Sequence, residues 1–148
     1  MGKRLEPTGK KTPEILVDLL AGHTDAVRDG PDAARRYLEN ALQYNRSMPN
    51  AVKFFTLDLL ASACADLGID ERRDEALALA WQHLEAAQAD TGRQLTEYLP
   101  TAKMFDVGLR AAVDIDDIET AVLWCDRAIA LGLGRAFERK AENLRRRL

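Results

Sequence analysis

Four acidic side chains lie close together in one short segment: Asp114, Asp116, Asp117 and Glu119. Carboxylate oxygens are the ligands that a hard cation such as Ca²⁺ prefers. A calcium-binding loop also needs a central glycine and a terminal glutamate, and this segment lacks both. We therefore interpret it as a turn and a helix N-terminus, where acidic side chains cap free N–H groups and favour the positive end of the helix dipole.

Histidine and cysteine side chains could bind a metal or form a nucleophile–base pair. His23 and His83 are the only histidines, and neither has a Cys or Asp beside it at metal-ligand spacing. Cys64 and Cys125 both lie within apolar helical patterns, which is typical of buried thiols in a reducing compartment. The glycines at 132 and 134 follow a predicted helix rather than a strand, so they indicate a helix end and not a phosphate-binding loop. We therefore predict no catalytic residue, no metal site, no cofactor and no enzymatic activity.

The length and the hydropathy pattern favour one compact helical domain. A chain of 148 residues is long enough to bury a hydrophobic core. No alternating run of Val, Ile and Thr stands out, which argues against strands. The N-terminus has no apolar region typical of a signal peptide, and no apolar run approaches the roughly 20 residues of a membrane span. We expect a cytoplasmic protein that makes no membrane contact.

The charges are unevenly distributed along the chain. The net charge of −3 gives no general electrostatic attraction to nucleic acid. Basic residues concentrate in segment 1–11, which we expect to be a disordered arm, and near the C-terminus. The C-terminal basic residues are Arg139, Lys140, Arg145, Arg146 and Arg147. They are either the polar exterior of an end helix or a contact surface for an acidic partner or a phosphate backbone.

A pattern of small residues recurs three times at intervals of roughly forty residues. Ala34, Ala76 and Ala121 fall in register. Two helical turns after each alanine, and so on the same helix face, comes a pair of residues: Ala41-Leu42, His83-Leu84 and Ala128-Ile129, respectively. Each segment is preceded by another apolar helix that contains an aliphatic residue beside a small one: Leu20-Ala21, Leu60-Ala61 and Val107-Gly108. The repeated unit is therefore a helix, a turn and a helix, which predicts a solenoid whose neighbouring units bury each other's apolar faces.

This pattern resembles that of the tetratricopeptide-repeat (TPR) family. The third unit, VGLRAAVDIDDIETAVLWCDRAIALG, carries the resemblance best, and LLASACADLG at Leu59–Gly68 resembles the first helix of the second unit. The resemblance covers residues 13–133. It implies an all-α, right-handed α-solenoid of about three antiparallel helix pairs with a C-terminal capping helix, as a single domain over residues 12–148.

Start and stop signals place the helices within this frame. We predict helices at 13–28, 31–45, 49–67, from 70 or 71 to 89, from 92 or 99 to 114, at 117–131 and at 135–147. The helix at 49–67 is apolar on most sides, so we expect it to lie centrally with other helices covering both flanks.

In the family, the first helices of the pairs line a concave groove that binds peptides. By register, the resemblance places Phe55, Asp58, Ser62 and Asp66 in the groove from the second unit, and Ala102, Phe105 and Leu109 from the third. The resemblance therefore implies a non-enzymatic interaction module, an adaptor, scaffold or assembly subunit that binds a protein partner. Acidic and apolar groove residues favour a basic or amphipathic helical segment over a C-terminal carboxylate.

Two other functions remain open from the sequence. The basic ends could attach a small helical subunit to a nucleic-acid-bound assembly, although the net charge makes this less favoured. A short solenoid with an apolar end could instead assemble with itself. In that case the exposed end would be the first helix, with Ile15 and Leu19 unpaired on one side.

Overall fold

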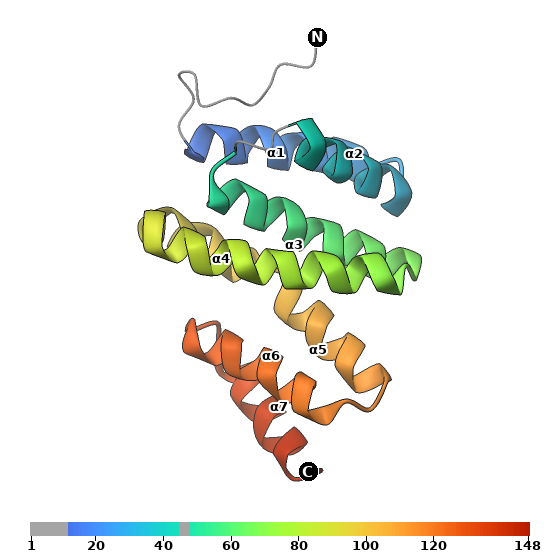
Figure 1. Cartoon of the computed structure of the whole chain (residues 1–148), viewed down its shortest axis with the longest axis vertical. Helices are drawn as coiled ribbons and strands as arrows, with labels where there is room; N and C mark the ends of the chain where they lie inside the picture. Colours follow the sequence, from blue (N-terminus) through green and yellow to red (C-terminus); the bar gives the residue numbers. More distant parts are fainter. Residues whose placement is uncertain (1–11, 45–47) are drawn as a thin grey trace. The chain divides into compact units, whose positions relative to one another are not determined.

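The computed structural model describes residues 12–44 and 48–148, without the side chains of residues 12, 13, 44 and 90–98. Every regular element in these ranges is helical (Figure 1). The elements are α1 (Thr12–Val27), α2 (Pro31–Tyr44), α3 (Asn50–Leu67), α4 (Asp70–Tyr98), the 3₁₀ turn η1 (Leu99–Thr101), α5 (Met104–Asp114), α6 (Ile118–Ala130) and α7 (Arg135–Arg145). The predicted all-α class is confirmed, and the predicted disordered arm at 1–11 lies outside the described residues. Contacts divide the chain into an N-terminal unit that ends at Tyr98 and a C-terminal unit from Leu99 to Leu148.

The centre of the N-terminal unit is α3. It contacts α1, α2 and α4, and Figure 1 shows it between the first two helices and α4. Its buried side chains point to most sides of the helix, among them Val52, Phe54, Leu57, Leu60 and Cys64. A helix that is apolar on most sides must be covered on most sides, so the predicted central position is confirmed.

Local signals set several helix ends where the sequence predicts them. Gly68 follows α3 with φ 70°, a left-handed conformation that glycine adopts without steric cost. The backbone N–H of Ile69 donates to the Cys64 carbonyl at 2.9 Å, which closes a Schellman motif at this end. At the start of α6, the Asp117 carboxylate accepts from the Thr120 backbone N–H at 3.2 Å. The interpretation of the acidic segment as a helix cap is therefore confirmed for Asp117.

The boundary between α4 and α5 differs from the prediction. The turn-forming residues 90–92 do not end α4, which continues to Tyr98, and α5 begins at Met104 rather than at 92 or 99. A glycine inside a helix costs only about 1 kcal/mol relative to alanine, so Gly92 alone does not stop a helix. The break comes at Pro100, which lies in η1 and disfavours helical backbone in the residue before it.

In the C-terminal unit, α6 contacts both α5 and α7. Aromatic side chains from all three helices form its core. The ring of Phe105 meets the Trp124 ring edge to face at 6.2 Å and the Phe137 ring at 6.4 Å. Such edge-to-face pairs each contribute about 0.5–1.5 kcal/mol beyond the burial of their area. This core packs α5, α6 and α7 against one another.

In two of the helix pairs, a glycine of the first helix lies against an aromatic ring of the second. Gly22 of α1 lies directly against the Tyr37 ring of α2, and Gly108 of α5 lies against the Trp124 indole of α6. A Cβ at either glycine would overlap the ring. The Tyr37 hydroxyl also donates to the Leu19 carbonyl at 3.3 Å. Both aromatics follow the alanine of their own segment, Ala34 or Ala121, by one helical turn, so a similar contact occurs in two of the helix pairs.

Candidate functional site

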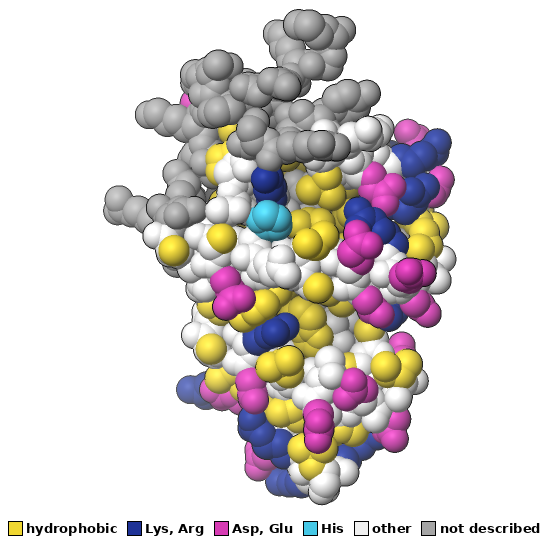
Figure 2. Space-filling view, in the orientation of Figure 1, with side chains coloured by type: hydrophobic (Ala, Val, Ile, Leu, Met, Phe, Trp, Pro, Cys, Tyr) yellow, Lys and Arg dark blue, Asp and Glu magenta, His cyan; other side chains and the backbone are white. Residues whose placement is uncertain are grey.

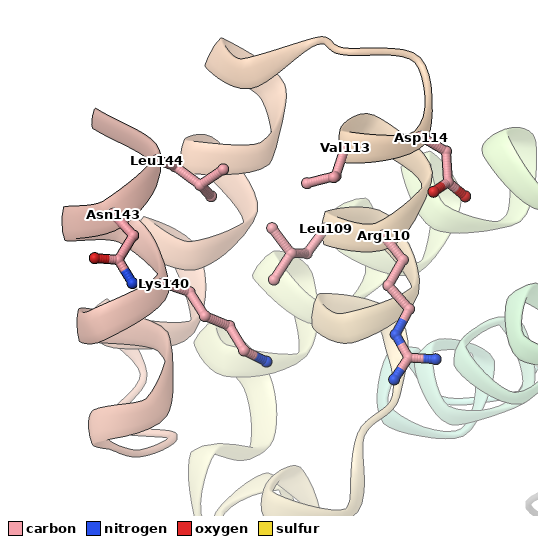
Figure 3. Close-up of a pocket in the computed structure, with 7 residues that line it drawn as sticks. All are labelled: Leu109, Arg110, Val113, Asp114, Lys140, Asn143 and Leu144. Carbon is pink, nitrogen blue, oxygen red and sulfur yellow. The ribbon is translucent and has the colours of Figure 1, made fainter. Parts of the chain in front are cut away.

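A groove runs between α5 and α7 within the C-terminal unit (Figure 3). Its volume is about 380 Å³. The lining residues are Leu109, Arg110, Val113, Asp114, Lys140, Asn143 and Leu144. Apolar grooves of this size with a few polar groups at their margin are where proteins most often bind ligands or partner segments.

The floor of the groove is apolar, and helix periodicity explains its composition. Leu109 and Val113 are one turn apart on α5, so they share a face, and Leu144 faces them from α7. Leu109 and Leu144 are buried, whereas Val113 is 37% exposed. The buried pair therefore closes the base of the groove, and Val113 offers apolar surface that a ligand could cover.

The margin of the groove carries charge from both helices. Figure 3 shows the Arg110 guanidinium on α5 and the Lys140 ammonium on α7 toward the same end, with Leu109 between them. Asp114 lies one turn further along α5, and Asn143 lies further along α7. The two cations thus mark one end of the groove and the single carboxylate marks the other.

The two cations differ in their partners. The Lys140 Nζ lies 3.5 Å from Asp106 Oδ1 and 5.3 Å from the centroid of the Phe137 ring. Arg110 is exposed, and within the described part of the chain it has no ion-pair partner. A long contact between exposed groups contributes little free energy, so both cations can meet a ligand.

Only one residue of the predicted groove lines the groove in the structure, namely Leu109. Phe105 is buried in the aromatic core of the C-terminal unit, and Ala102 is half-buried before α5 begins. Sequence reasoning missed Arg110, Val113, Asp114, Asn143 and Leu144 as groove residues. The one-turn spacing of Leu109 and Val113 could have predicted that they share a helix face. Nothing in the sequence indicated which helix lies opposite that face.

The predicted groove residues on α3 differ in their exposure. Phe55 is 4% exposed and its ring lies 4.6 Å from that of Phe54, so both aromatics belong to the core. Asp58 is 1% exposed, Ser62 is half-buried and Asp66 is exposed. The buried members of this set would be accessible to a partner only after a rearrangement of α3.

Most of the predicted basic surface is paired with carboxylates. Arg145 contacts Asp126 at 2.6 Å and Arg147 contacts Asp116 at 2.9 Å. Arg146 contacts Glu142 within α7 at 3.2 Å, and Lys140 contacts Asp106 as described above.

Arg139 is exposed and has no ion-pair partner within residues 12–44 and 48–148. Figure 2 shows Lys and Arg side chains beside Asp and Glu side chains on the visible face of the C-terminal unit. The mixed signs reduce the positive field that attracts a phosphate backbone.

The first helix does not present the side chains expected for self-assembly. Ile15 and Leu19 are both fully buried, so the expectation that they lie unpaired on one side of α1 is wrong. Their positions i and i+4 place them on the face that α1 turns toward the core. The exposed apolar residues of α1 are Val17 and Val27.

His83 and the two cysteines occupy structural positions. The His83 Nδ1–H of α4 donates to Asn50 Oδ1 of α3 at 3.0 Å. Burial, and secondly the nearby Lys53, lowers the pKa of His83. Cys64 and Cys125 are fully buried, and burial raises the pKa of both thiols, which favours the unreactive protonated form. Across the described ranges, no three His, Cys, Asp or Glu side chains gather where they could hold a metal ion.

Comparison of the chain with protein families, with curated proteins and with solved structures found no match. None of the helices within the described residues combines the length and the apolar character needed to cross a membrane. The function proposed below is based on the groove between α5 and α7.

Proposed function

We propose that this protein is a non-enzymatic interaction module that binds a segment of a protein partner in the groove between α5 and α7. The observation that carries the proposal is the composition of the groove, with Leu109, Val113 and Leu144 as an apolar floor and charged groups from both helices at its margin. Affinity in helical grooves comes from apolar anchors at the centre, while the charged margin selects the partner.

The helical architecture supports this proposal. Segments that lie between two helices commonly bind as amphipathic helices, whose side chains at i, i+3 and i+4 reach the floor. A glycine-to-aromatic contact occurs in two helix pairs, at Gly22–Tyr37 and at Gly108–Trp124, which supports a repeated helix-pair unit. On this basis we propose one domain over residues 12–148, a right-handed solenoid of about three helix pairs in which α7 is the capping helix.

The compartment is part of the same proposal. Cys64 and Cys125 are free and buried on different helices, which suits a reducing cytoplasm in which thiols stay unpaired. The basic arm and the C-terminal basic residues leave attachment to nucleic acid as the alternative. Its expected signature is a steep loss of binding as salt rises, because bound cations are released from the phosphate backbone.

The experiment that tests the proposal is a selection of peptides from a displayed random library on the full chain. The dissociation constants of the selected peptides are then measured by fluorescence anisotropy. Val113→Asp places a charge on the groove floor, and Ile115→Asp makes the same kind of change at a residue that is 75% exposed and outside the groove. We expect Val113→Asp to weaken binding by about tenfold or more, since a desolvated charge without a partner costs more than 1 kcal/mol.

The matched variant should bind as wild type does. The proposal is wrong if no peptide is selected, or if Val113→Asp and Ile115→Asp bind the selected peptides equally well. Circular dichroism of both variants checks that the helices remain formed.

A further inference from the structure

The partner segment that fits this groove can be specified from its charges. We infer that the occupant is an acidic amphipathic segment of a protein, which places an apolar side chain on the floor and carboxylates at the end of the groove that Arg110 and Lys140 mark. This inference rests on the proposed function, because it names the chemistry of the partner that the same groove would bind. The sequence-based expectation was a basic or amphipathic helical segment, and it rested on other residues, among them Asp58 and Asp66 of α3.

The arrangement of the two cations favours an acidic occupant. Arg110 and Lys140 come from opposite walls and extend toward the same end of the groove (Figure 3). An acidic segment that lies along this end could pair its carboxylates with both cations, and charge-assisted contacts of this kind are shorter and stronger than neutral hydrogen bonds. Leu109 lies between their stems, so an apolar side chain and a carboxylate would be adjacent in the bound segment.

Neither cation forms a strong ion pair with another described residue. The described part of the chain provides no ion pair for Arg110. Among the described residues, Lys140 forms one ion pair, the 3.5 Å contact with Asp106, whose side chain is 55% exposed. A ligand carboxylate can therefore replace Asp106 at Lys140 at little cost. By contrast, Arg145 donates to both oxygens of Asp126, at 2.6 and 2.8 Å, so a ligand carboxylate would have to replace a strong ion pair there.

The charges of the groove also favour one direction for the bound segment. Asp114 stands at the end of the groove away from the two cations. A carboxylate placed there would be repelled, whereas a neutral or basic residue would be accepted. The amide of Asn143 can donate and accept at the margin of α7 without selecting a charge. The bound segment should thus be acidic at the Arg110–Lys140 end and neutral or basic at the Asp114 end.

The form of the groove favours a protein segment over a small carboxylate. Sites for small molecules bury most of the ligand surface. Here the floor is three side chains and one of them, Val113, is 37% exposed before any ligand binds. Such a site covers one face of a ligand, which is how a groove receives an amphipathic helix.

The test uses the peptides selected on the wild-type chain as probes. The tightest peptide is compared with a synthetic version in which every Asp and Glu is replaced by Lys, so that its apolar residues are unchanged. We expect the selected peptides to be acidic and the Lys-substituted version to bind at least about tenfold more weakly. Arg110→Glu and Lys140→Glu should each weaken the acidic peptide by about tenfold, whereas Arg139→Glu, which changes the net charge equally but lies outside the groove, should not.

A charge exchange separates a binding role from a structural one. Lys140→Glu should gain affinity for the Lys-substituted peptide, because the new carboxylate would face a cation; a merely misfolded variant would bind neither peptide. If the selected peptides are neutral or basic and still depend on Val113, the inference is overturned while the proposed function stands. If their binding ignores Val113, both fail.

Discussion

The indole of Trp124 lies directly against the backbone of α5 at Gly108, where no side chain intervenes. A Cβ at Gly108 would overlap three atoms of the indole: Cε2, Cδ2 and Nε1. The indole also contacts Phe105 edge to face, and the Arg127 guanidinium lies 4.9 Å from its centroid. The absence of a side chain at this one position thus allows α5 and α6 to approach closely and places the wall of the groove.

The Gly108→Ala variant should be less stable than wild type. Alanine favours a helix over glycine by about 1 kcal/mol, but the added methyl must displace Trp124 in a packed core, which costs about 1–3 kcal/mol. We expect a net loss of up to about 2 kcal/mol in the free energy of unfolding, measured by urea denaturation. In the double variant with Trp124→Leu, the loss should be smaller than the sum of the two single losses. An alanine variant that is more stable than wild type by about 1 kcal/mol, the full helix preference, would contradict this close contact.

The left-handed conformation of Asp116 provides a second test. Its φ is 57°, and the Asp117 N–H donates across the turn to the Ala112 carbonyl at 2.9 Å. A β-branched residue is strained at positive φ, so Asp116→Val should lower the free energy of unfolding by about 1–2 kcal/mol. Asp116→Gly should match wild type or exceed it slightly, because glycine adopts this conformation without strain.

Both Asp116 variants also lose the ion pair with Arg147, so Arg147→Ala is the control. That pair is exposed, at 51% for Arg147 and 80% for Asp116, and its loss should change stability little. If Asp116→Val is no less stable than Asp116→Gly, the turn does not have the conformation described.

The pH dependence of stability should report the environment of His83. Its pKa is lowered by burial and by Lys53, and its neutral ring donates to Asn50. The folded chain therefore binds this proton less readily than the unfolded chain, whose His pKa is about 6.5. The contribution of His83 is fully present above about pH 6.5 and is lost as the pH falls below that value toward the folded pKa.

The measurement is urea denaturation between about pH 5 and pH 8 on wild type and on His83→Gln. Gln carries no titrating proton, so the difference in unfolding free energy between the two proteins should shift in favour of the variant as the pH falls. Other titrating groups contribute to both proteins and cancel. A difference that does not change with pH would show that His83 titrates alike in the folded and unfolded chains.

An ion-pair network should connect α2 and α4 more effectively than the exposed pairs do. Glu39 of α2 accepts from Arg35 at 2.7 Å and from Arg72 of α4 at 3.1 Å. All three side chains are at most 32% exposed. We expect Glu39→Gln to lower the free energy of unfolding by about 0.5–1 kcal/mol, and by less at high salt.

The matched control is Asp25→Asn, which removes the pair with Arg28. That pair lies at the C-terminal end of α1 at 3.7 Å, and both side chains are at least 75% exposed. It should have no measurable effect. Equal effects from the two variants would mean that partial burial and the link between helices add nothing.

Helix positions could be predicted from the sequence because their signals are local. Gly68 ends α3 through its left-handed backbone and Asp117 begins α6 through its own carboxylate, whatever the rest of the chain does. The length of α4 could not be predicted in this way. A glycine at 92 weakens a helix by an amount that the surrounding helix easily offsets, so the stop came only at Pro100.

The groove depends on the tertiary structure for the opposite reason. Helical spacing predicts that Leu109 and Val113 share a face, but it does not say which helix that face meets. Lys140 and Leu144 follow in sequence by about thirty residues, and only the packing of α5 and α7 around α6 brings them opposite. The ion pairs of Arg145 with Asp126 and of Arg147 with Asp116 also join distant segments, so the sequence did not predict them.

The amino-acid sequence alone thus determined the helices, their caps and the small residues at which they approach each other, because each of these depends on a few neighbouring residues. The tertiary structure alone decided which side chains are covered and which face a groove. It buried Phe55 and Ile15, which the sequence placed at binding surfaces, and left Val113 accessible. The physical reason is that burial depends on distant segments, whose contacts no local pattern encodes.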